Sequence, residues 1–236
     1  MKKTTKRKTT RATRKRSKIL LTSILLLTCL LAAPVISGGC VDEDERETAS
    51  EENDMNNYPT ANMKILSQTG EELTVKIELY PDKAPKTVEN FIRLANSGFY
   101  DGMHFHRIVP GGCLQGGGYK FIQTDSGLST DESVGKVAPI EGEFASNGHP
   151  ENDLRHTKGT ISMARTSDPN SATSQFFLCV GDYPSWDGEY AAFGMAKDEE
   201  SLLALDKLAS SRYVFAGYAF QTLPYPLIKI VSVTIE

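Results

Sequence analysis

Apolar and polar residues alternate from residue 73 to residue 79, as they do in a strand that buries one face. The apolar positions fall at every second residue: Leu73, Val75, Ile77 and Leu79 alternate with Thr74, Lys76 and Glu78. A Thr69-Gly70 pair comes just before this run and suits a hairpin turn. The pattern therefore predicts a second, shorter strand at Met63–Leu66 that pairs with the first.

Two other segments follow the period of a helix that buries one side. Pro85 begins the first helix and Gly98 ends it. Its apolar face consists of Val88, Phe91, Ile92 and Ala95. The second helix is expected over Glu199–Ala209, with Asp198 as its N-cap. Its inward residues are Leu202, Leu205 and Leu208.

Short apolar runs elsewhere predict further strands, separated by loops rich in Gly, Pro, Asn and Asp. These strands are expected at Phe105–Val109, Thr160–Met163, Gln175–Val180, Ala191–Phe193 and Ile228–Ile235. Many short strands with only two helices favour a mainly β fold, either a closed barrel or a sandwich.

The N-terminal segment has the order of a secretory signal. Lys2–Lys18 is strongly basic, Ile19–Ile36 is almost wholly apolar, and the small residues 37–39 precede Cys40. We favour a lipoprotein signal in residues 1–39, with Cys40 as the lipidated residue. The alternative is an uncleaved membrane helix, although the apolar run is near the lower length limit for one. Both interpretations place the rest of the chain on the extracytoplasmic face of the cell membrane.

Charge divides the remaining chain further. Residues 40–236 hold 16 basic and 30 acidic residues, which argues against binding to nucleic acid. Residues 40–61 are dense in acid and poor in apolar residues, so we expect a disordered tether there. The folded domain is then expected over residues 62–236.

Two segments have compositions that ordinary structure does not explain. The first covers residues 105–117 and reads FHRIVPGGCLQGG; the second covers 159–177, beginning GTISMAR and ending SQFF. They resemble the two signature blocks of the cyclophilin family, and the likeness extends through further blocks over 62–236. The resemblance implies a closed eight-stranded antiparallel β-barrel capped by two α-helices. It also implies peptidyl-prolyl cis/trans isomerase activity.

Rotation about a prolyl bond needs no covalent chemistry. Amide resonance sets a barrier of roughly 18–20 kcal/mol, and a catalyst must favour the twisted amide over both planar forms. A fixed cation with N–H donors beside the prolyl nitrogen would do so, and arginine suits this role. By the resemblance, Arg107 is that residue, Gln115 holds it or the substrate carbonyl, and His106 lies at the pocket edge.

The resemblance also implies a set of substrate-binding residues: Phe177, Gln175, Met163, Ala164, Arg165, Cys113, Trp186 and Tyr190. Because side chains alternate across a strand, Phe176 belongs in the core if Phe177 faces the proline. Met163 is expected mainly to pack, and the side chain of Arg165 to be a charge at the rim.

Three features depart from the family pattern. Gly112 and Cys113 stand where the family has Phe and Met in the proline pocket, and Trp186 stands where it has Leu. The loop after Gly118 is long and polar. We therefore expect a shallow pocket in which Trp186 partly fills the space that Gly112 leaves.

No metal site or cofactor is expected. His104, His149 and His156 have no ligand spacing, and no CxxC pair is present. A disulfide between Cys113 and Cys179 is conceivable in an exported protein, but we expect two free, buried thiols.

The partners implied are Xaa-Pro segments of unfolded or flexible exported proteins, met by a monomer held at the membrane. The alternative function is a proline-peptide binding module on the same fold, with weak or no catalysis.

Overall fold

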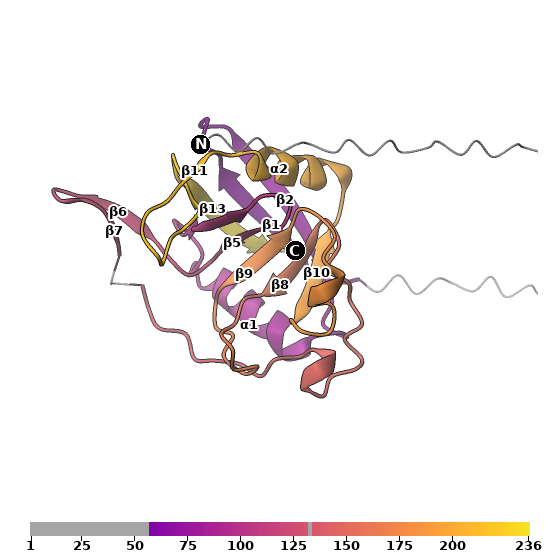
Figure 1. Ribbon diagram of the computed structural model, residues 1–236. Coiled ribbons are helices and arrows are strands. Elements are labelled where there is room, and N and C mark those ends of the chain that lie inside the picture. The colour runs from indigo at the N-terminus through magenta and orange to yellow at the C-terminus, as the bar shows by residue number, and fades with distance from the viewer. Residues whose placement is uncertain (1–56, 132–133) are drawn as a thin grey trace, which may run out of the picture. The chain divides into compact units, whose positions relative to one another are not determined.

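The computed structural model describes residues 57–131 and 134–236 (Figure 1). The expected signal segment, Cys40 and most of the tether lie outside these ranges. Within them, no helix is both long and apolar enough to cross a membrane. Thr60 and Ala61, assigned to the tether, are instead the first residues of a strand. The reason is that Ala61 is fully buried and pairs with strands on both sides.

The helices lie where the sequence predicted them, at α1 (Pro85–Asn96) and α2 (Glu199–Ala209). The main strands are β1 (Thr60–Leu66), β2 (Glu72–Leu79), β3 (His104–Phe105), β4 (Arg107–Val109), β5 (Cys113–Gly116), β8 (Thr160–Met163), β9 (Phe176–Cys179), β10 (Ala192–Ala196) and β13 (Ile228–Ile235). Two small ribbons stand apart from them: β6 (Phe121–Thr124) pairs with β7 (Gly127–Thr130), and β11 (Tyr213–Val214) with β12 (Leu223–Pro224).

The main strands form one sheet that closes on itself. Their order is β3-β13-β1-β2-β10-β8-β9-β5-β4, and every pairing is antiparallel. The two edge strands, β3 and β4, are consecutive in the chain and separated only by His106. Counted as one strand, they give the eight-stranded barrel that the family resemblance implied. Figure 1 shows α1 and α2 at opposite ends of this barrel.

Aromatic side chains fill the barrel beneath α1. Phe91 packs against Tyr100, Phe176 and Phe193 with ring centroids 5.2–5.8 Å apart. All four side chains are fully buried. The apolar face of α1 is therefore part of the same core as the strands.

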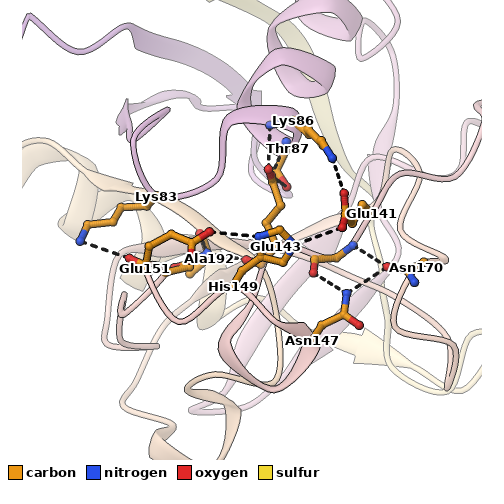
Figure 2. A network of polar contacts seen from close by, with 12 residues as sticks. Lys83, Lys86, Thr87, Glu141, Glu143, Asn147, His149, Glu151, Asn170 and Ala192 are labelled. Carbon is orange, nitrogen blue, oxygen red and sulfur yellow. Dashed lines mark hydrogen bonds and ion pairs between the residues drawn. The ribbon is translucent and has the colours of Figure 1, made fainter.

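Helix α1 receives its N-terminal cap from a distant residue. Its N-cap residue, Ala84, has no side chain that can accept a hydrogen bond. Glu143, only 1% exposed, accepts instead from the backbone N–H groups of Lys86 at 3.0 Å and Thr87 at 2.8 Å (Figure 2). It also accepts from the Thr87 hydroxyl at 2.7 Å. The positive end of the helix dipole favours a carboxylate in this position.

A more exposed set of charges surrounds this cap. His149 lies between two carboxylates, with Nε2 3.2 Å from Glu141 Oε1 and Nδ1 3.0 Å from Glu151 Oε1 (Figure 2). Lys86 also forms an ion pair with Glu141. The loop from 141 to 151 is thereby tied to the start of α1.

Candidate active site

Four neighbouring strands place one residue each in a single row on the outer side of the barrel wall. Arg107 of β4 is opposite Gln115 of β5, and Gln115 is opposite Phe177 of β9. Phe177 is in turn opposite Ser162 of β8. Because side chains alternate along a strand, Phe176 faces the core while Phe177 joins a separate cluster.

A pocket of about 130 Å³ lies over this row. The residues that line it are Arg107, Cys113, Gln115, Ala164, Arg165, Phe177, Trp186 and Tyr190. All of them belong to the set that the sequence assigned to the site. Folding therefore brings together stretches of chain that are far apart in the sequence.

The mouth of the pocket is polar and organised by two glutamines. Arg107 Nη1 donates to Gln115 Oε1 at 3.3 Å, and Gln115 Nε2 donates to Gln175 Oε1 at 3.0 Å. A guanidinium has five N–H donors, so this bond leaves others available to a ligand. The arrangement holds a permanent positive charge beside a cavity that is walled partly by the rings of Phe177, Trp186 and Tyr190.

A chain of polar side chains that the sequence does not predict lies behind Phe177. The His156 ring stacks on Phe177 at 5.8 Å between centroids. Its Nε2 lies 3.0 Å from Ser162 Oγ and its Nδ1 lies 3.2 Å from Asp187 Oδ1. Burial lowers the pKa of His156 despite the nearby Asp187, so the ring is neutral at neutral pH. No sequence spacing links these residues, because their contacts exist only in the folded barrel.

Trp186 forms one wall of the pocket, with its ring 5.3 Å from that of Phe177. Its indole also stacks on Tyr183 at 4.3 Å. A Cβ at Gly112 would lie 2.7 Å from Val109 Cγ1 and 3.1 Å from the Tyr183 hydroxyl. The prediction that Gly112 leaves a space for Trp186 is therefore wrong, because Val109 and Tyr183 already occupy it.

Arg165 supports the opposite wall. Its side chain is only 16% exposed, so it is not the rim charge that we expected. Nε and Nη2 donate to the Glu189 carbonyl at 3.1 and 2.9 Å, and Nη1 donates to the Thr166 carbonyl at 2.9 Å. The guanidinium lies over the rings of Phe144 at 5.2 Å and Tyr190 at 4.7 Å. It thus fixes Tyr190 beside the pocket.

Three of the predicted site residues do not line this pocket. His106 is 5% exposed and its ring packs against Tyr119 at 4.8 Å. Burial, helped by the charge of Arg107, lowers the pKa of His106 to about 4. Met163 lies in the core and is 1% exposed. Gln175 does not line the pocket itself but accepts a hydrogen bond from Gln115, which does. Neither His106 nor Met163 is placed to touch a ligand in the pocket.

The two cysteines of the folded unit are free and buried, as the sequence analysis expected. Burial raises the pKa of Cys113 to about 11 and that of Cys179 to about 12. Both are therefore protonated at neutral pH. Over residues 57–131 and 134–236, no group of three His, Cys, Asp or Glu side chains could hold a metal ion.

Comparison with known families gives one match over nearly the whole folded unit. The family model described as cyclophilin type peptidyl-prolyl cis-trans isomerase/CLD covers residues 62–235. The matched range contains every residue of the pocket.

Several bacterial proteins are similar over the same region. A peptidyl-prolyl cis-trans isomerase of Acinetobacter baylyi is 38% identical over 167 residues, 69% of this chain and 80% of that protein. Peptidyl-prolyl cis-trans isomerase B of Escherichia coli is 34% identical over 167 residues, 69% of this chain and 93% of that protein.

Solved structures agree. A cyclophilin type isomerase of Cryptosporidium parvum, crystallised in the presence of the dipeptide Ala-Pro, is similar with a TM-score of 0.54 and 27% identity. The likeness covers 74% of this chain and 98% of that one.

Proposed function

Since this chain belongs to the cyclophilin family and is a peptidyl-prolyl cis-trans isomerase, we propose that catalysis takes place in the pocket over Phe177. The observation that carries the proposal is the position of Arg107. Its guanidinium is held by Gln115 at 3.3 Å beside a small cavity with aromatic walls. A proline ring fits against Phe177, Trp186 and Tyr190, and its nitrogen then faces the charge.

Arg107 lowers the barrier through the electronic change that rotation causes. In either planar isomer the nitrogen lone pair is delocalised into the carbonyl. At the twisted geometry that lone pair is localised and accepts a hydrogen bond, which a guanidinium N–H donates. Stabilisation that exists only in the transition state raises kcat. Gln115 keeps the donor in place before the substrate arrives, so that little reorganisation is needed.

The test measures cis/trans exchange of an Ala-Pro peptide by two-dimensional exchange NMR. Arg107→Ala should lower kcat/KM by about 100-fold, the usual effect of losing one preorganised donor. The kcat/KM of Arg107→Lys should lie between those of the wild-type protein and Arg107→Ala, since lysine keeps the charge but lacks the planar set of N–H donors. Arg107 is exposed, so the midpoint of urea unfolding should stay unchanged in both variants.

Two results would count against this assignment. Equal exchange rates for the wild-type protein and Arg107→Ala would remove Arg107 from the mechanism. Binding of the peptide by the wild-type protein without faster exchange would instead support the binding module considered from the sequence.

We further propose that the enzyme is a monomer, tethered by a lipid on Cys40, that assists folding of exported proteins. The support is the order of a basic segment, an apolar segment and small residues before Cys40. Mass spectrometry of the protein from its own cell should find the chain beginning at a lipidated Cys40. Cys40→Ser should abolish that species, whereas persistence of residues 1–39 in the wild-type protein would favour a retained helix. Sedimentation of the folded unit measures its molar mass in solution, which should be that of a single chain.

A further inference from the structure

A second cavity, of about 360 Å³, lies beside β4. Residues 107–110 form one side of it and residues 218–222 form the other. The two sides are joined by a hydrogen bond from Ile108 N–H to the Thr222 carbonyl at 3.0 Å. We refer to this cavity as the β4 groove.

The segment that forms the far side of the groove exposes large aromatic side chains. Tyr218 is 92% exposed and Phe215 is 65% exposed, and their rings meet edge to face at 6.0 Å. Phe220 has the opposite role, since its ring packs against Tyr119 at 5.0 Å and Phe121 at 5.2 Å. Phe220 thus holds the segment in place, while Tyr218 and Phe215 face solvent. Exposed apolar groups that cluster in this way are typical of a surface that binds a protein or another ligand.

The β4 groove and the proline pocket share one lining residue. Arg107 lines both cavities, and it is the only charged residue lining the groove. An extended chain advances about 3.3–3.6 Å per residue. A polypeptide that places its proline beside Arg107 therefore has its next few residues within reach of the groove.

We propose that the β4 groove is an accessory subsite for the client polypeptide. It binds a large apolar side chain, aromatic or aliphatic, within about three residues of the proline. The groove has almost three times the volume of the proline pocket, and apart from Arg107 its lining is uncharged. Such side chains are exposed in unfolded proteins and buried in folded ones. The subsite would thus direct the enzyme to unfolded clients. The proposal rests on the isomerase function given above.

The experiment compares two long peptides that share a central Ala-Pro. One has phenylalanine on both sides of this pair and the other has serine. For each, kcat/KM is measured by exchange NMR and Kd by calorimetric titration. The variant is Tyr218→Ser, which removes an exposed ring from the groove. The matched control is Tyr225→Ser, which removes a ring that is 57% exposed in the same part of the chain but does not line the groove.

The wild-type protein and Tyr225→Ser should prefer the phenylalanine peptide by about tenfold in both kcat/KM and Kd. Tyr218→Ser should bring both ratios close to one. The proposal is overturned if the wild-type protein has no preference, or if the two variants lose it equally. It is also overturned if Tyr218→Ser keeps the preference but loses binding to phosphatidylcholine vesicles, because the ring would then serve a membrane surface. The ratio of the two Kd values tests the subsite even if the protein does not accelerate exchange. Absence of accelerated exchange would contradict the proposed catalysis and not the subsite.

Discussion

Cys113 on β5 lies directly opposite Cys179 on β9. The neighbouring pair of residues in this ladder, Gly112 and Val180, is joined by a hydrogen bond from Val180 N–H to the Gly112 carbonyl at 2.9 Å. The cysteine rung is therefore one without backbone hydrogen bonds, in which Cα atoms are about 4.5 Å apart. A disulfide spans Cα distances of roughly 4.4–6.8 Å, so the two free thiols are placed to form one with little movement of either strand.

We expect this pair to oxidise slowly at neutral pH and faster as the pH rises. The thiolate is the reactive form, and burial raises the pKa of Cys113 to about 11 and that of Cys179 to about 12. Diamide, a thiol oxidant, should produce an intramolecular disulfide, seen as the loss of a pair of hydrogens by mass spectrometry. Because Cys113 lines the pocket, the oxidised protein should bind a proline peptide more weakly. Cys179→Ala should show neither change, and rapid labelling of both thiols in the folded protein at pH 7 would contradict the expectation.

Replacing Arg165 should weaken substrate binding without changing the chemistry. The side chain fixes Tyr190 through its contact with the ring at 4.7 Å and its bonds to the Glu189 carbonyl. Arg165→Ala should raise KM for a proline peptide by roughly tenfold, since cation–π contacts of buried groups reach about 2 kcal/mol, and should leave kcat nearly unchanged. Arg155→Ala removes an exposed arginine that does not line the pocket and serves as the control. A fall in kcat with constant KM would place Arg165 in the reaction itself.

The buried cap on α1 should be a major source of stability. Glu143→Gln keeps the size of the side chain but removes its charge and one acceptor oxygen, so that a donor at the helix start loses its partner. Hydrogen bonds to charged groups contribute about 1.5–3 kcal/mol each, and we expect the free energy of unfolding to fall by about 2–3 kcal/mol. Urea denaturation measures it. Glu141→Gln, on the exposed side of the same network, should cost far less, and equal losses for the two variants would contradict the cap.

His149 should make the unfolding free energy depend on pH. Partial burial disfavours the charged ring, but the hydrogen bonds that it donates to Glu151 and Glu141 outweigh this effect and raise the pKa of His149 above its usual value. A raised pKa means that the charged form is stabilised by folding. The contribution is therefore full below the ordinary histidine pKa and is lost as the pH rises through the folded value. The difference in stability between the wild-type protein and His149→Gln should be larger at pH 6 than at pH 8, and a difference that grows toward pH 8 would reverse the assignment.

The hydrophobic pattern predicted most strands of the sheet, and the family resemblance supplied their closure into a barrel. The strand Thr160–Met163 and the strand Ile228–Ile235 have the predicted bounds, and Asp198 caps α2 through Ser201 N–H at 2.9 Å as expected. The β6–β7 hairpin lies where the sequence predicts a long polar loop. Its residues are largely exposed, so no apolar alternation marks them. Strand β5 has only four residues and ends in a glycine, so its sequence does not show the alternation of a strand, and its pairing with β4 and β9 defines it.

The sequence predicted the residues that line the pocket, but not the residues that pack behind them. The pocket residues came from the family resemblance, and the fold brings most of them together. Tyr183, which stacks on Trp186, and His156, which stacks on Phe177, were not assigned. Both residues support the pocket by packing against residues from other segments of the chain. Such contacts depend on the folded barrel, so the neighbouring residues in the sequence do not reveal them.

The pairing of β1 with β13 has a consequence for how the barrel closes. Ala61 lies opposite Ile77 on one side and Ile235 on the other, so one edge of the first strand is paired only by the last strand. During synthesis, β1 has one open edge until β13 has been made. Unpaired edges are prone to association with other chains, and closure between such distant segments is slow. The barrel therefore closes only when its C-terminal strand is available, and until then the open edge of β1 is exposed to other chains.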